Sequence, residues 1–159
     1  MPNVEVKIRK TVRGATALLQ ERFGRGCPWR VAVICTCLNR TRGARAAPIL
    51  AELFRRWPNA WAMDAASTRE EERRDVEALL HPLGFFDARA GTVFRLSDVA
   101  ASFYGTSRAG HVVELAAVRG VGPYAVASMR AFCLGDLTVK TTDRILADRL
   151  RWLRRKRRR

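Results

Sequence analysis

Long apolar runs, histidine and cysteine are scarce in this chain, and each scarcity excludes a class of protein. No apolar run reaches the roughly 20 residues of a membrane-spanning helix, and the N-terminal stretch holds no apolar core of a secretory signal. Two histidines exclude a histidine-rich metal site, and four cysteines do not suggest a disulfide scaffold. We therefore expect a compact intracellular protein, in the nucleus if the source is eukaryotic and in the cytoplasm or nucleoid if it is prokaryotic.

Turn signals typical of β-hairpins are also missing, because the sequence has no Asn-Gly or Asp-Gly pair. Apolar residues recur instead at helical spacing. The run 29–38 also suits a strand, since it holds Val31, Val33 and Thr36, but no partner strand is evident and we interpret it as a buried helix. The predicted fold class is all-α. The expected helices cover residues 4–22, 29–38, 44–57, 85–103, 111–118 and 124–134, a segment ending at Leu80, and a last segment carrying Ile145 to Leu153.

Several residues predict where these helices begin. Pro28 suits the first turn of the second helix. Ser67 and Thr68, followed by two glutamates, are typical of a capping box that opens the helix ending at Leu80. Thr141 or Thr142 is expected to cap the last helix.

Basic residues outnumber acidic ones by 30 to 15, which gives a formal charge of +15. Only four of the 30 are lysine, which leaves 26 arginines, the residue type that makes forked contacts with phosphate. A hydrophobic fraction of 48% argues against a disordered basic protein. We expect one domain over residues 1–153 and a basic tail over 154–159, which suits a nuclear signal, a phosphate-binding arm or a solvated end. The expected partner is a polyanion.

The most informative segment is 115–124, which is typical of a helix, a Gly-x-Gly turn and the start of a second helix. Gly120 and Gly122 let backbone N–H groups face outward, and with the N-terminus of the second helix these groups suit a DNA phosphate. Alone, such a turn is more often just a tight connection. Here Asp143 follows Tyr124 by 19 residues, at the expected start of another helix.

This hairpin, followed by an apolar helix and then by an aspartate that opens another helix, resembles the helix-hairpin-helix DNA glycosylases. Within that superfamily the chain is most similar to the glycosylase domain of methyl-CpG-binding mismatch thymine glycosylases. The resemblance covers most of the chain from Leu18 to Leu153. It is carried by Leu19-Gln20-Glu21, Pro28-Trp29, Leu38-Asn39-Arg40-Thr41, Pro82-Leu83-Gly84, the segment 87–90 and the segment 120–124.

The resemblance implies removal of thymine or uracil mispaired with guanine in duplex DNA, and it implies roles for particular residues. Asp143 would be the catalytic carboxylate, and Tyr124 would line the base pocket and pack on the pyrimidine. Gln20 and Glu21 match residues whose amide or backbone reads the edge of the base.

Further residues would contact the DNA itself. By the same resemblance, Arg40 would fill the space that the flipped nucleotide leaves, and Leu83 would wedge beside the unpaired guanine. The hairpin residues Gly120, Val121 and Gly122 would bind the DNA backbone.

The chemistry of base removal agrees with these roles. As the N-glycosidic bond breaks, positive charge develops on the sugar, and a fixed carboxylate such as that of Asp143 stabilises it. The alternative is that Asp143 only caps its helix, which is a common role for aspartate. Members of the superfamily that also cut the strand place a Schiff-base lysine at the hairpin position that Tyr124 holds here. We therefore expect a monofunctional enzyme that leaves an abasic site.

We expect no metal and no iron–sulfur cluster, because no cysteine follows Cys133; a monovalent cation at the hairpin is compatible with the resemblance. The expected protein is a monomer that binds duplex DNA containing G:T or G:U mismatches and no membrane. Two other functions stay open. One is a glycosylase for another base, such as adenine opposite 8-oxoguanine, and the other is a non-catalytic DNA-binding module.

Overall fold

The computed structural model describes residues 12–103 and 105–159, and every regular element in these ranges is a helix. The predicted all-α fold class is confirmed. None of these helices is long and apolar enough to cross a lipid bilayer. The helices are α1 (Leu19–Arg22), α2 (Pro28–Leu38), α3 (Gly43–Arg56), α4 (Ala60–Ser67), α5 (Glu70–Leu80), a 3₁₀ turn (His81–Leu83), α6 (Phe86–Ser102), α7 (Arg108–Ala116), α8 (Pro123–Leu134) and α9 (Arg144–Arg157).

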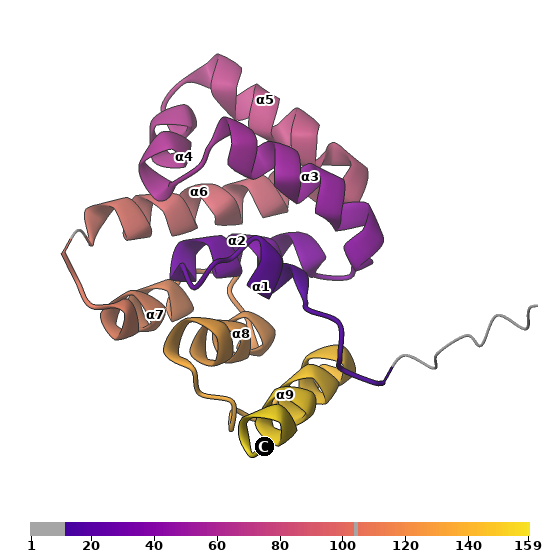
Figure 1. Ribbon diagram of the computed structural model, residues 1–159. Coiled ribbons are helices and arrows are strands. Elements are labelled where there is room, and N and C mark those ends of the chain that lie inside the picture. The colour runs from indigo at the N-terminus through magenta and orange to yellow at the C-terminus, as the bar shows by residue number, and fades with distance from the viewer. Residues whose placement is uncertain (1–11, 104) are drawn as a thin grey trace, which may run out of the picture.

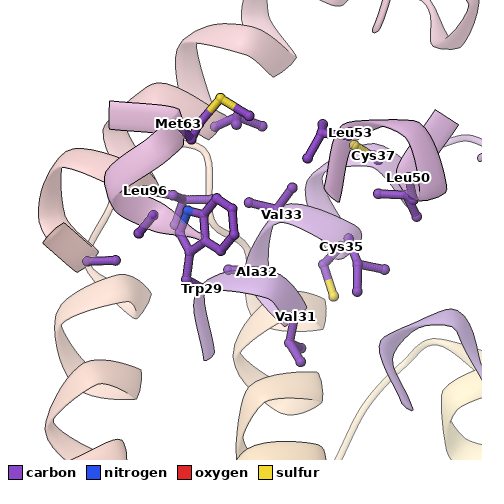
Figure 2. Close-up of a cluster of buried hydrophobic side chains, with 14 of the residues drawn as sticks. Trp29, Val31, Ala32, Val33, Cys35, Cys37, Leu50, Leu53, Met63 and Leu96 are labelled. Carbon is purple, nitrogen blue, oxygen red and sulfur yellow. The ribbon is translucent and has the colours of Figure 1, made fainter. Parts of the chain in front are cut away.

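The centre of the molecule is α2, with α3 to α6 on one side of it and α7 and α8 on the other (Figure 1). Pro28 occupies the first turn, where its missing N–H leaves no helical bond unmade. Because eight of the 11 residues of α2 are buried, the helix has no polar stripe, which is why its sequence also suited a strand. Trp29, Val33 and Leu96 are among the side chains that pack together here (Figure 2).

Buried apolar side chains form two clusters of very different size. The larger one fills the space between α2 and its neighbours α3 to α8. The smaller one lies between α8, α9 and the chain that joins them. Its members are Ala127, Ala131, Leu137, Leu146 and Leu150. Tyr124 contacts both clusters, so it stands where the main body meets α9.

The first expected helix, over residues 4–22, is much shorter in the structure. Residues 1–11 lie outside the described ranges, residues 12–18 form turns and irregular chain, and only α1 is helical. Gly14 has a φ of 79°, and a Cβ there would lie 2.2 Å from the carbonyl oxygen of Asp148 on α9. The helical prediction for residues 12–18 is therefore wrong, because this segment packs against α9 in a conformation that suits glycine.

The prediction of a capping box at Ser67 and Thr68 is also wrong, and α4 was missed. Asn59 caps α4 by accepting the N–H of Ala62 at 2.9 Å. Ser67 is the last residue of α4, and the Ser67 and Thr68 hydroxyls donate to carbonyls of the preceding turn. The helix that the box was expected to open is present, as α5 from Glu70.

The last helix begins at Arg144, directly after Asp143, and it ends later than expected. Its cap is Asp143 rather than one of the two threonines before it, since its Oδ1 accepts the N–H of Leu146 at 2.7 Å. The helix runs on to Arg157, so most of the basic segment 154–159 is helical. Arg154 donates to the carbonyl of Leu137 at 2.7 Å, which holds this end of α9 against the connection from α8.

Candidate active site

The turn between α7 and α8 lies where the sequence predicts a turn between two helices, and its two glycines have different reasons to be glycine. Gly120 has a φ of 102°, and a Cβ there would lie 2.4 Å from Oγ1 of Thr92 on α6. Gly122 has an ordinary φ of −104°, and a Cβ there would meet nothing within 4 Å. The surface above Gly122 is therefore open, beside first-turn N–H groups of α8 that have no helical acceptor. This arrangement suits an anion that approaches the backbone closely.

Tyr124, in the first turn of α8, is joined to Gln20 of α1. The buried Gln20 amide donates from Nε2 to the Tyr124 hydroxyl at 2.5 Å. Burial raises the pKa of Tyr124 well above its ordinary value, and the nearby Cys35 and the Asp143 carboxylate raise it further. The phenol is therefore neutral at physiological pH. The structure thus brings together two expected base-binding residues that are 104 residues apart in the sequence.

Asp143 is half-buried at the N-terminus of α9, and its charge acts on Tyr124. Its Oδ1 accepts the N–H of Leu146, and its own N–H donates to Oγ1 of Thr141 at 3.1 Å. Among the described residues, nothing donates to its second carboxylate oxygen. Asp143 is therefore a helix cap, as one reading of the sequence had it, and it also retains an oxygen that is free to face a ligand.

A cavity of about 550 Å³ lies between α2, α6 and the hairpin. Its lining includes Cys35, Arg40, Phe85, Gly122 and Tyr124. Gln20 and Asp143 do not line it. The structure therefore places Tyr124 in one wall of the cavity, in contact with Gln20 and within reach of the charge of Asp143.

The two candidate wedge residues differ sharply in exposure. Arg40 follows α2 in a left-handed conformation, with φ 55°, and its side chain is exposed. Leu83 is buried, with 6% of its surface exposed, whereas Phe85 is 71% exposed at the rim of the cavity. Gly84 and Phe85 both have a positive φ, and this reversal turns Leu83 into the core and Phe85 outward. The apolar side chain that this loop presents to solvent is that of Phe85, not Leu83.

Arg89 of α6 joins these two loops, and no role for it was predicted from the sequence. It is 5% exposed and donates to carbonyl oxygens at the C-terminus of α2 and in the loop before α6. Its partners are the carbonyls of Thr36 (2.5 Å), Cys37 (3.3 Å), Asn39 (2.7 Å), Leu83 (3.3 Å) and Gly84 (2.7 Å), and Oγ1 of Thr41 (3.1 Å). Burial lowers the pKa of Arg89 from its ordinary value. The signal in the sequence was one arginine among the apolar positions of a helix.

The carboxylate of Glu21, the other expected base-binding residue, is paired with an arginine of α9. Both of its oxygens accept from the buried Arg149 of α9 at 2.8 Å, and Oε2 also accepts the N–H of Leu18. Its own N–H donates to the Leu18 carbonyl at 3.0 Å. The side chain of Glu21 therefore faces α9 rather than the cavity beside Tyr124.

The cysteines are free thiols, and no group of three or more potential metal ligands occurs in residues 12–103 and 105–159. Burial raises the pKa of Cys35, Cys37 and Cys133 to about 12, so these thiols are neutral.

At the hairpin, the carbonyl of Arg119 accepts from the Arg95 guanidinium at 3.1 and 3.2 Å. Arg95, on α6, therefore stabilises the turn between α7 and α8.

No family model matches the chain. It is 34% identical over 150 residues to the methyl-CpG-binding domain protein 4-like protein of Arabidopsis thaliana, a match that covers 89% of this chain and 31% of that protein. It is 32% identical over 97 residues to the thymine-DNA glycosylase of Aeropyrum pernix, covering 61% of this chain and 41% of that protein. The chain thus spans less than half the length of either relative. It belongs to the family of DNA glycosylases that these relatives represent.

Proposed function

We propose that this protein is a monofunctional DNA glycosylase that hydrolyses the N-glycosidic bond of thymine or uracil mispaired with guanine in duplex DNA. The observation that carries the proposal is the arrangement around Tyr124. Its hydroxyl is bonded to Gln20, its ring is in the wall of a cavity, and the charge of Asp143 acts on it from the next helix. One relative is named a thymine-DNA glycosylase, which favours this choice of base.

In this proposal Asp143 is the catalytic residue. Departure of the base leaves positive charge on the deoxyribose, and a carboxylate fixed before the reaction stabilises that charge without reorganising. The helix cap fixes Oδ1, and the second oxygen faces the anomeric carbon and orients the attacking water. The base itself lies against Tyr124, and the Gln20 amide, which can both donate and accept, hydrogen-bonds the edge of the pyrimidine.

The DNA lies across the hairpin. A phosphate approaches over Gly122, where no side chain blocks the backbone N–H groups of α8. The net charge of +15 supplies the sequence-independent part of the affinity. With the duplex in this position, the loops that carry Arg40 and Phe85 lie at the other rim of the same cavity.

Extraction of the base leaves a gap in the duplex, and both loops supply side chains to fill it. Exposed apolar or cationic side chains commonly fill such gaps. Arg40 fills the space of the extruded nucleotide, as its resemblance to the glycosylases implies. Phe85 takes the wedge role that was expected of Leu83, because Leu83 is buried and Phe85 is exposed.

The proposal is tested with duplex oligonucleotides that contain one G:T, G:U, A:T or 8-oxoG:A pair. Each duplex is incubated with the protein and then treated with alkali, which breaks the strand at abasic sites. We expect breaks in the G:T and G:U duplexes only, and none without alkali. Breaks in the 8-oxoG:A duplex alone would show that another base is removed, and binding without any breaks would show a binding module.

A second experiment tests the monofunctional mechanism. Borohydride traps the Schiff base of a strand-cleaving glycosylase as a covalent protein–DNA adduct. Because Tyr124 stands where that lysine would be, we expect no adduct on a G:U duplex that the protein visibly processes. An adduct would show that Lys140 or another amine acts as a nucleophile.

A further inference from the structure

Arg149 forms a buried junction between three segments of the chain. Only 6% of its surface is exposed. Nε and Nη2 donate to the two carboxylate oxygens of Glu21, each at 2.8 Å, and Nη1 donates to the carbonyls of Gly14 and Ala15 at 2.9 and 2.8 Å. The guanidinium also stacks on the Trp152 ring at 4.7 Å. One side chain of α9 is thus held by α1 and by the chain that leads into α1.

We infer that the Glu21–Arg149 pair positions the catalytic helix: it fixes Asp143 relative to Gln20 and Tyr124, so Glu21 acts through α9 and not on the base. The inference rests on the proposed function, because it needs Asp143 to be the catalytic residue. It changes the role of Glu21 from a reader of the base to a positioning residue.

The path from the Glu21–Arg149 pair to the Asp143 carboxylate is short. Gln20 and Glu21 are neighbours on α1, and Gln20 bonds the Tyr124 hydroxyl while Glu21 bonds Arg149. Asp143 precedes Arg149 by six residues, which is about 9 Å along a helix. The same short helix therefore orders the base-facing pair and holds the helix that carries the carboxylate.

The attachment of α9 explains why this pair is needed. The buried residues of α9 are Leu146, Arg149 and Leu150, so the junction accounts for one of its three buried anchors. Two leucines in a small apolar cluster fix the depth of a helix but only loosely its rotation and its shift along its axis. A forked contact between guanidinium and carboxylate is directional, and it fixes both. A displacement of about 1 Å in a catalytic group costs about 100-fold in rate, so a helix held loosely would be a poor carrier of Asp143.

The test compares three variants in single-turnover excision, with protein in excess, on G:U and G:T duplexes. Glu21→Gln removes the charge and keeps the shape, and Arg149→Lys keeps the charge and removes the fork. The double variant Glu21→Gln/Arg149→Met removes both charges, so it leaves no unpaired buried ion. We expect each of the three variants to slow excision by about 10- to 100-fold, because each loses the forked contact between guanidinium and carboxylate. The factor should be the same for uracil and thymine, and the Kd for each duplex should stay within about twofold of the wild-type value.

A control with the same residue chemistry but greater exposure is the pair between Arg56 of α3 and Asp75 of α5, whose atoms are 2.9 Å apart, with Arg56 stacked on Trp57 at 4.5 Å. Asp75→Asn and Arg56→Lys repeat the same chemistry in the main body, so excision should keep the wild-type rate. A general sensitivity of the fold to lost ion pairs would slow the controls as well, and this would contradict a positioning role specific to α9.

Other outcomes overturn the inference directly. Wild-type excision by the folded double variant would show that the pair does not position Asp143. A loss that differs between uracil and thymine would show that Glu21 reads the base, and a matching rise in Kd would show a role in DNA binding. If the charge-removing variants do not fold, Arg149→Lys decides, and wild-type excision by it overturns the inference. Absence of excision by the wild-type protein, measured first, is instead a failure of the proposed function.

Discussion

Two buried arginines join segments at the candidate site, and they use different partners to do so. Arg89 donates only to carbonyl and hydroxyl oxygens, and no carboxylate in the described ranges pairs with it. Arg149 donates to two carbonyls and to both oxygens of Glu21. The end of α2 presents its last carbonyls to Arg89, and the helix dipole gives them partial negative charge. Arg149 lies within a helix rich in other cations, and there a full negative charge balances it.

The difference separates the site into two sides. On one side, Arg89 holds the loops that carry Arg40 and Phe85 against the main core by donating to their backbone carbonyls and to those at the end of α2. On the other side, the helix that carries Asp143 is held by a small apolar cluster, by the Glu21–Arg149 ion pair and by hydrogen bonds from Arg149 and Arg154 to backbone carbonyls. We call the first of these the probe side and the second the catalytic side. We expect the probe side to be rigid and the catalytic side to open at lower free energy. The predictions below test each side in turn, beginning with the largest effect.

The largest effect is expected on the catalytic side, for Asp143→Asn. Asparagine caps a helix about as well as aspartate, so the free energy of unfolding should change by only a few tenths of a kcal/mol. Loss of the negative charge opposite the developing sugar cation should slow single-turnover excision by about 100- to 1,000-fold. Binding of the duplex should be unchanged or tighter, since one anion near the DNA is removed. Excision near the wild-type rate, with normal binding, would make Asp143 a cap and nothing more.

Arg89→Met should produce the next largest effect, on the probe side. It leaves several buried carbonyls without a donor, and we expect it to lower the free energy of unfolding by about 3 kcal/mol. Urea denaturation measures this loss. Arg30→Met is the control, because Arg30 also donates to carbonyls, those of Phe23 and Pro58, but is only half-buried. An equal loss in both variants would show that burial of Arg89 contributes little.

Leu83→Ala should affect mainly stability and Phe85→Ala mainly activity on duplex DNA, although the two residues are only two positions apart. Leu83 is buried, so its truncation should lower the free energy of unfolding by about 2 to 3 kcal/mol and affect excision from single-stranded and duplex DNA equally. Phe85 is exposed, so its truncation should leave the stability within about 0.5 kcal/mol of the wild type.

The functional loss in Phe85→Ala should appear only where a base must be extracted. Excision of uracil from a G:U duplex should slow by about tenfold, and excision from single-stranded DNA should not, since extraction costs a few kcal/mol only in the duplex. Arg40→Ala should show the same contrast. Equal losses on both substrates would show that these side chains support the pocket rather than fill the gap in the duplex.

The smallest effect concerns the pKa of Tyr124. Because burial raises this pKa, the folded protein holds the phenolic proton more tightly than the unfolded chain, in which tyrosine titrates near pH 10. The resulting contribution to stability is fully present below that pH and is lost as the pH rises above it. In urea denaturation the wild type should therefore lose more stability between about pH 8 and pH 11 than Tyr124→Phe does. Parallel losses in the two proteins would contradict the shift.

The helices that the sequence predicted well are those whose ends carry local signals. The run before Pro58 and the glycines around the hairpin mark boundaries that the structure keeps. Residues 12–18 and α4 were misjudged because their structure depends on contacts far along the chain or on one cap. Gly14 packs on α9, and Asn59 restarts a helix immediately after a proline.

The candidate site was predictable where it follows a motif and unpredictable where it follows backbone geometry. Tyr124, Gln20 and Asp143 were named from the sequence, and the structure joins the first two by a hydrogen bond and places the third where its charge acts on Tyr124. The burial of Leu83 and the exposure of Phe85 depend on two successive residues with positive φ, a conformation that phenylalanine rarely adopts. Arg149 was hidden among 26 arginines, and the one local signal for Arg89 was its place among the apolar positions of its helix.

The central claim is that a base extracted from the duplex lies between Tyr124 and Asp143, with Phe85 in the gap. The direct test is a crystal structure of the protein bound to a G:T duplex whose mispaired thymidine carries a 2′-fluorine, which destabilises the sugar cation and so preserves the bond. We expect the thymine against Tyr124, the free oxygen of Asp143 facing the anomeric carbon, and the Phe85 ring within the stack. A thymine that remains stacked in the duplex, with Asp143 facing solvent, would contradict the account.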